Sequence, residues 1–143
     1  MRIGVAAAFL LCLFVAACDD ATTDGPVIPP GPRTFVFGVR GVPDAEGQFI
    51  AATSDSLVLA KLEAQLALPA AQRNLHIHGP IAIGNGDENL SWHWRFLPGE
   101  WDMVEISVEL CDGTPQLVED DVDRWVQDIG DFCPWGSYVQ REL

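Results

Sequence analysis

The sequence predicts an α+β fold in which two helices pack on a mostly antiparallel sheet of about five to six strands. Three observations lead to this prediction: several segments carry apolar residues at alternate positions, two segments carry them at helical spacing, and the connections between segments are short. The expected order of elements is ββαβββαβ, because short connections between consecutive strands favour antiparallel pairing. At 143 residues, the chain has the length of one domain.

The expected strands are segments of alternating apolar and polar residues that are bounded by turn residues. The clearest alternation lies in residues 103–111, where every even position from Val104 to Leu110 is apolar. These side chains are expected to share one buried face of the sheet. The complete set of expected strands is 34–40, 48–53, 74–84, 90–97, 103–111 and 137–143.

The expected helices are marked by their ends as well as by their spacing. The first is predicted over residues 57–68, after Ser and Asp residues that can cap it and before Pro69. The second is predicted to open at Thr114 and Pro115, which suit the N-cap and first helical positions, and to end at Gly130. Its expected buried face consists of Val118, Val122, Trp125 and Ile129.

The N-terminal segment has the features of a bacterial export signal. Arg2 supplies a positive charge, and residues 3–17 form an apolar run that is shorter than the roughly 20 residues needed to span a bilayer. The run ends in VAAC at residues 15–18, which resembles the lipobox of bacterial lipoproteins. We therefore expect residues 1–17 to be a lipoprotein signal peptide and Cys18 to be the lipid-carrying first residue of the mature protein. An ordinary cleaved signal and an uncleaved transmembrane helix are the alternatives.

Residues 18–33 are expected to be a lipidated, Pro-rich tether, and residues 34–143 one globular domain. The two or three acyl chains of a lipoprotein give stable attachment to a bilayer, where a single chain would be marginal. The expected location is therefore the bacterial cell envelope, with the domain held on a membrane and facing the periplasm or the exterior.

The cysteines are consistent with this location. Of the 4 cysteines, Cys12 would leave with the signal and Cys18 would carry lipid. Cys111 and Cys133 then remain as a pair in a compartment where disulfides form, so we expect them to be bonded. The alternative, a two-cysteine metal site, lacks further ligands at the usual CxxC spacing.

The charge of the chain restricts its partners. The formal net charge is −13, and loss of Arg2 with the signal would leave 7 basic and 21 acidic residues, or −14. Such a surface repels phosphate backbones and anionic lipid head groups, so nucleic acid is not an expected partner and membrane attachment requires the anchor. A basic protein or a cationic ligand is the expected kind of partner.

Three histidines are the candidates for a metal site. His76 and His78 would share one face of a strand, and His93 lies on the next expected strand. If these strands pair, three imidazoles could converge as in three-histidine zinc sites. The alternative is a buried histidine that is hydrogen-bonded to a carboxylate such as Glu105 or Glu109. No cofactor is expected, although a small metal-binding protein or metal-dependent enzyme is the alternative function.

Tryptophans are the candidates for a binding surface. Trp92, Trp94 and Trp101 could form an exposed aromatic stripe, but we favour a core position for Trp92 and Trp94. The sequence has no GxSxG, phosphate-loop or HExxH motif, so it marks no catalytic residue. The expected function is therefore a non-enzymatic binding or interaction domain of unknown ligand.

Most of residues 34–143 resemble a family of small secreted domains that is named after the amino-terminal domain of slime-mould binding protein seventy-four. The pattern runs from HIxG at 76–79 through SWH at 91–93 to its most specific parts, ExxxExCDG at 105–113 and CPWxS at 133–137. The resemblance supports the fold and the disulfide. The lipobox departs from the ordinary cleaved signal of the family. The sequence has no DxDxDG loop, so it does not predict an EF-hand calcium site. Further matching positions are Val118, Glu119 and Glu142.

Overall fold

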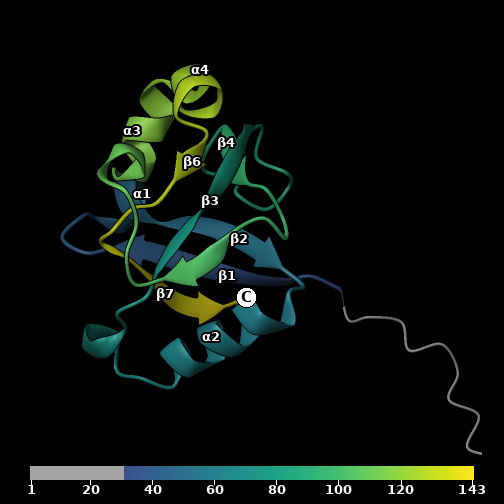
Figure 1. The fold of residues 1–143 in the computed structure, drawn as a ribbon, viewed down its shortest axis with the longest axis vertical. Helices are drawn as coiled ribbons and strands as arrows, with labels where there is room; N and C mark the ends of the chain where they lie inside the picture. Colours follow the sequence, from purple (N-terminus) through teal and green to yellow (C-terminus); the bar gives the residue numbers. More distant parts are fainter. Residues whose placement is uncertain (1–30) are drawn as a thin grey trace, which may run out of the picture.

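The computed structural model describes residues 31–143, which form two antiparallel sheets flanked by short helices (Figure 1). This arrangement confirms the α+β class. Within these residues no helix is long and apolar enough to cross a membrane. The expected signal peptide, Cys18 and most of the expected tether lie outside the described residues.

The first sheet has β1 at its centre. Strand β1 (Arg33–Val39) pairs in antiparallel fashion with β2 (Phe49–Thr53) on one side and with β7 (Ser137–Glu142) on the other. The short helix α1 (Asp44–Gly47) connects β1 to β2. Because side chains on both faces of β1 are buried, its apolar residues are continuous rather than alternating.

The second sheet is built around β3 (His76–Ile83), which runs obliquely across the first sheet (Figure 1). Its first residues pair with β5 (Asp102–Val104), its middle with β6 (Asp131–Phe132), and its last residues with β4 (Trp94–Phe96). All three partners are antiparallel to β3. The chain end of β5 therefore lies beside the beginning of β3, where His76 pairs with Val104.

Two of the expected strands are shorter than the alternation suggested, and this part of the prediction was wrong. In place of a strand over 90–97, only the three residues of β4 are extended. In place of 103–111, only the three residues of β5 pair with β3, and a 3-10 turn follows at Glu109–Cys111. The physical reason is that both predicted strands run past the ends of β3. Residues after Val104 would have to pair before His76, where β3 begins, and residues before Trp94 would have to pair after Ile83, where it ends.

The residues beyond β5 consequently leave the sheet. Ile106 is 85% exposed and Leu110 is 68% exposed, although the alternating pattern had predicted both to be buried. Their segment ends at the disulfide between Cys111 and Cys133, whose Cα atoms are 5.1 Å apart. The expected bond is thus confirmed, and it ties the segment after β5 to the segment that follows β6.

Helix α2 (Ser56–Leu66) confirms the first helix prediction to within two residues at each end. The carboxylate of Asp55 accepts hydrogen bonds from the backbone N–H groups of Leu57 and Val58, which caps the helix. Val58 and Leu62 bury its inner face. In Figure 1 the helix lies below the sheets, at the opposite end from α3 and α4.

The second predicted helix is interrupted. It consists of α3 (Pro115–Asp120), α4 (Val122–Arg124) and a π-helical turn at Trp125–Ile129, and it ends at Gly130 with a φ of 84°. The break falls at Asp121, whose side chain accepts a hydrogen bond from the backbone N–H of Arg124 and so starts a new helical turn. The expected inner face is confirmed, since the four predicted residues are buried or pack against the core.

The core between the two sheets is largely aromatic. Phe37 stacks on Phe49 with ring centroids 5.3 Å apart, and Trp94 meets Phe132 edge to face at 5.3 Å. Gly79 of the HIxG motif is required here, because a Cβ at this position would lie 2.6 Å from the backbone Cα of Trp101. The motif thus brings β3 close enough to Trp101 to bury the indole.

Candidate ligand-binding site

The three tryptophans considered as a surface stripe are core residues. Trp92 is 4% exposed, Trp94 is fully buried and Trp101 is 3% exposed. Two of their indole N–H groups are satisfied internally, since Trp92 donates to the carbonyl of Gln48 and Trp101 to that of Ala52. The core position favoured for Trp92 and Trp94 is therefore confirmed, and the alternative of an exposed stripe with Trp101 is wrong. Alternating aromatic residues fit a buried strand as well as an exposed one, so the pattern alone could not decide.

The three histidines do not converge on one point. The carbonyl of His93 accepts a hydrogen bond from Gly84, which places His93 six residues along β3 from His78, or roughly 20 Å at ~3.3 Å per residue. The imidazole of His93 pairs with Glu119 instead. Within the described chain no group of three His, Cys, Asp or Glu side chains could hold a metal ion. The three-histidine zinc hypothesis is therefore wrong, because β4 pairs with the far end of β3.

His76 and His78 do share a face of β3, and they also share a partner. The hydroxyl of Ser107 lies 2.6 Å from Nε2 of His76 and 3.1 Å from Nδ1 of His78. Behind His78, its Nε2 lies 3.8 Å from a carboxylate oxygen of Asp131. Sequence reasoning missed Ser107. The sequence did contain a signal for it, because Ser107 is the one polar uncharged residue among residues 103–111, the segment expected to be a strand.

The burial of His76 determines which atoms of His76, Ser107 and His78 carry the protons of their hydrogen bonds. His76 is 4% exposed, and this burial lowers the pKa of its imidazole below the ordinary value of 6.5. The charge of His78 acts in the same direction, whereas Asp112 opposes it. A neutral His76 can accept the single hydroxyl proton of Ser107, which leaves the Ser107 oxygen free to accept from His78.

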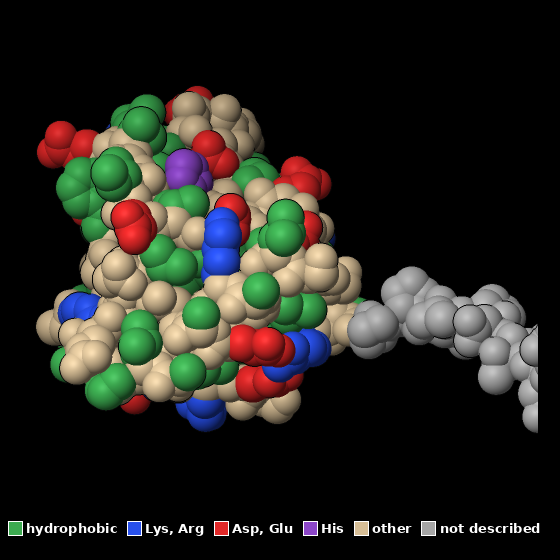
Figure 2. All heavy atoms as spheres, turned by 60° about the horizontal axis from the view of Figure 1, so that its bottom comes forward, with side chains coloured by type: hydrophobic (Ala, Val, Ile, Leu, Met, Phe, Trp, Pro, Cys, Tyr) green, Lys and Arg blue, Asp and Glu red, His purple; other side chains and the backbone are tan. Residues whose placement is uncertain are grey.

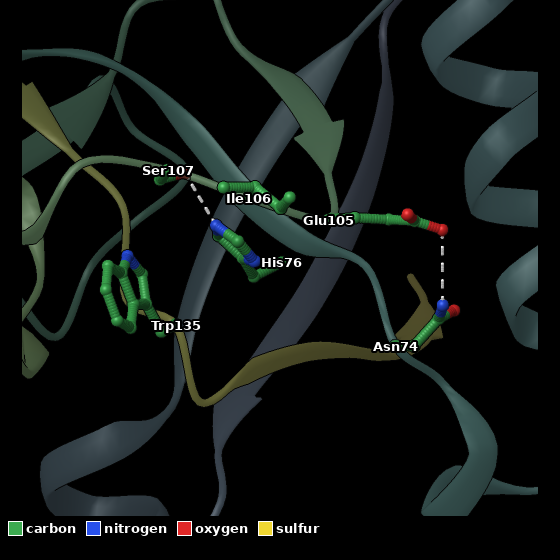
Figure 3. A pocket seen from close by; sticks show the side chains of 6 residues that line it. All are labelled: Asn74, His76, Glu105, Ile106, Ser107 and Trp135. Atoms are coloured by element: carbon green, nitrogen blue, oxygen red, sulfur yellow. Dashed lines mark hydrogen bonds between the residues drawn. The ribbon is translucent and has the colours of Figure 1, made fainter.

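A cavity of about 270 Å³ opens beside this group (Figure 3). His76 and Ser107 lie in its middle, with the indole of Trp135 on one side and the Glu105–Asn74 pair on the other. The side chain of Ile106 projects between these two sides of the cavity. The cavity therefore combines a polar centre, two apolar side chains and one carboxylate.

The match to known families covers the whole of this region. Residues 32–143 match the model of the family described as the N-terminal domain of binding protein seventy-four. The chain belongs to this family. No curated protein and no solved structure gives a significant match.

In this member of the binding protein seventy-four family, the CPWxS and CDG motifs meet at the cavity. The carboxylate of Asp112 accepts hydrogen bonds from the backbone N–H groups of Trp135 at 2.8 Å and Gly113 at 2.9 Å. The N–H of Cys133 donates to the carbonyl of Cys111, next to the disulfide. These bonds fix the backbone of Trp135, while its side chain remains 48% exposed. The two motifs thus hold an aromatic side chain at the surface of the domain.

The surroundings of Trp135 are apolar and acidic. Ile106 and Val108 are exposed on the same segment as Glu105 and Glu109. Figure 2 shows that acidic and hydrophobic side chains also lie side by side on the face drawn there. Exposed apolar side chains mark an interaction site where they lie together in one patch, and Trp135 and Ile106 line the same cavity. The structure thus places the exposed aromatic side chain of the candidate site at Trp135, which the sequence alone had not selected.

Proposed function

We propose that this protein is a lipid-anchored binding domain of the bacterial cell envelope, which binds a basic protein or cationic ligand at the cavity beside Trp135. The observation that carries the proposal is the half-exposed indole of Trp135, whose backbone is fixed next to a cavity with polar groups at its centre. Binding sites commonly combine apolar walls with a few converging polar groups, and tryptophan is frequent among the residues that dominate binding.

The charge of the chain supports a cationic partner. A formal net charge of −13 attracts basic molecules from a distance and raises their rate of encounter. Salt screens such attraction beyond about 8–10 Å, so the long-range part of binding should be sensitive to ionic strength. Short-range contacts with Trp135 and Ile106 would then supply the part of the affinity that salt does not remove.

The anchor is the part of the proposal that rests on sequence. The VAAC sequence at residues 15–18 follows an apolar run and precedes a Pro-rich segment. Acylation at Cys18 would hold the acidic domain near a membrane whose lipids repel it. Expression in a bacterium with labelled palmitate tests this: Cys18→Ser should abolish labelling, whereas Cys12→Ser should not. Labelling that survives Cys18→Ser, or mature protein cut elsewhere by mass spectrometry, would contradict the anchor.

The binding experiment uses the full mature chain in mild detergent, with a fluorescent hexalysine peptide as the probe and hexaglutamate as its counterpart. Hexalysine should bind, and its affinity should fall between about 20 mM and about 300 mM salt because the long-range attraction is screened. Trp135→Ala should weaken binding at least about fivefold. The control is Leu57→Ala, because Leu57 is an exposed apolar residue on α2, outside the lining of the cavity.

Two results would overturn the binding proposal. Equal affinity for hexalysine and hexaglutamate would show that charge does not select the partner. Equal hexalysine affinity for Trp135→Ala and the wild-type chain would show that the cavity is not the binding site. Circular dichroism and intact disulfide mass must first establish that each variant is folded.

A further inference from the structure

We propose that the cavity beside Trp135 is a subsite for one alkyl cation, the side chain of a lysine or an arginine. This inference rests on the proposed function and names the chemical group that the cavity would bind. It concerns one side chain of the partner, whereas the proposed function concerns the partner as a whole.

The size of the cavity favours a side chain over a larger molecule. Its volume of about 270 Å³ lies below the range of about 300–1,000 Å³ that is usual for sites of drug-sized ligands. Trp135 and Ile106 flank the opening, and both are substantially exposed. A methylene stem could pack between these apolar side chains while its charged end reaches the polar centre.

The indole supplies the first attraction for a positive charge. Tryptophan has the strongest cation–π interaction of the aromatic side chains, worth about 0.5–1 kcal/mol at exposed sites and more where water is excluded. Both existing cation–π contacts of the described chain involve other rings, those of Phe35 and Tyr138. Trp135 thus has no internal cation within the described residues, and its ring lines the cavity.

The carboxylate of Glu105 supplies the second attraction. Glu105 lies across the cavity from Trp135, and within the described residues its one side-chain hydrogen bond is a long one of 3.5 Å from the amide of Asn74. No Lys, Arg or His forms an ion pair with Glu105 in the part of the chain that the structure describes. Asp112 is not among the lining residues, and its carboxylate accepts hydrogen bonds from the backbone N–H groups of Trp135 and Gly113. An incoming cation would therefore meet one carboxylate directly, that of Glu105.

The centre of the cavity does not oppose a cation at neutral pH. His76 would repel it only when protonated, and burial disfavours that form of His76. The hydroxyl oxygen of Ser107 can accept a hydrogen bond from an ammonium or guanidinium group. The arrangement is thus an aromatic wall, an apolar neighbour and one carboxylate around a neutral polar centre.

The experiment titrates the full mature chain with Nα-acetyl-lysine N-methylamide while NMR follows the indole N–H resonances. The resonance of Trp135 is assigned by its loss in Trp135→Leu. The lysine and arginine derivatives should shift this resonance saturably. The norleucine derivative, which has a similar stem but no charge, should bind at least about tenfold more weakly, a difference of about 1.4 kcal/mol.

Matched variants separate the cavity from the general acidity of the surface. Glu105→Gln should weaken binding of the lysine derivative about three- to tenfold through loss of one nearby charge. Asp87→Asn makes the same change of charge in the loop between β3 and β4, at the far end of β3 from His76, and should leave affinity unchanged. Asparagine also tolerates the positive φ of 63° at that position.

The outcomes distinguish the subsite from the proposed function. If the norleucine derivative binds as well as the lysine derivative, or if Glu105→Gln and Asp87→Asn behave alike, the cation subsite is overturned. A saturable shift with methyl glucoside but not with the lysine derivative would also overturn it and would assign the cavity to neutral polyols. In these cases Trp135-dependent binding of hexalysine would still support the proposed function, whereas its absence would overturn both.

Discussion

The hydroxyl of Ser107 lies 2.6 Å from Nε2 of His76, and it joins the segment that leaves the second sheet after β5 to the first residue of β3. Among residues 31–143 this segment has no strand partner beyond Val104, so the hydroxyl is one of the few polar contacts that hold it. The contact therefore connects the fold to the cavity, since Ser107 and the neighbouring Ile106 both line it.

Ser107→Ala tests the structural part of this relationship. The substitution leaves the buried Nε2 of His76 without its partner, and an unpaired buried polar atom costs about 1–3 kcal/mol. We expect the free energy of unfolding in urea to fall by an amount in this range. Ser54→Ala is the control, because Ser54 is exposed and its hydroxyl makes no hydrogen bond within the described chain. Coincident unfolding curves for the two variants would contradict a stabilising role of the Ser107 hydroxyl.

Stability should fall in mildly acidic solution because of His76. Burial lowers the pKa of His76 below its ordinary value of 6.5, so the unfolded chain binds a proton more readily than the folded one. The stabilisation from neutral His76 is therefore fully present above pH 6.5 and is lost as the pH falls from there through the folded-state pKa. The groups that face His76 are His78 from its own strand, Ser107 and Asp112.

Urea unfolding of the wild-type chain and of His76→Gln, from about pH 8 to about pH 5, measures this effect. The difference in unfolding free energy between the two proteins should shrink as the pH falls, because the glutamine does not titrate. The carboxylates of the chain titrate in both proteins and cancel in the comparison. A difference that stays constant or grows towards low pH would show that the pKa of His76 is not lowered in the folded state.

The disulfide between Cys111 and Cys133 should contribute substantially to stability. It joins residues with a sequence separation of 22, and a closed loop of this size is worth about 3 kcal/mol in the chain-entropy description. Reduction of the wild-type chain and the double change Cys111→Ala with Cys133→Ala should each lower the free energy of unfolding by about this amount. Reductant should have no effect on the double variant, which serves as the control. Weaker hexalysine binding should accompany the loss, because Trp135 follows Cys133 closely.

The parts of the fold that sequence predicted well are those that depend on local chemistry. The cap at Asp55, the opening at Thr114 and the glycine at position 130 each mark a helix end in the structure. The pairing of the two domain cysteines followed from the count of cysteines in the chain. Such features involve neighbouring residues or simple elimination, so tertiary packing had little opportunity to change them.

The parts that sequence predicted poorly depend on partners distant in the chain. Residues 103–111 alternate like a strand, but β3 offers pairing to only the first few of them. The position of His93 also depends on distant pairing. The long loop before β4 determines which end of β3 His93 lies beside. The candidate site shows the same limit. The core position favoured for Trp92 and Trp94 is confirmed, but nothing in the sequence pattern marked Trp135, next to the disulfide, as the exposed indole.

The last prediction concerns two buried tryptophans that differ in one hydrogen bond. Nε1 of Trp101 donates to the carbonyl of Ala52 at 3.0 Å, whereas Nε1 of Trp94 is buried without a hydrogen-bond partner in the described residues. Tryptophan to phenylalanine removes the same atoms at each site and leaves a similar void, so the cavity contributions should largely cancel. The remaining difference is the N–H group. Its removal takes a hydrogen bond from Trp101 but relieves an unmet desolvation penalty at Trp94.

Trp94→Phe should therefore destabilise the chain less than Trp101→Phe, by about 1–2 kcal/mol in urea unfolding experiments. Trp125→Phe provides a further comparison, because its Nε1 donates to the carbonyl of Leu117 at 3.1 Å, and it should lose the same kind of bond as Trp101. If Trp94→Phe is at least as destabilising as Trp101→Phe, the indole N–H of Trp94 must have a hydrogen-bond partner in solution.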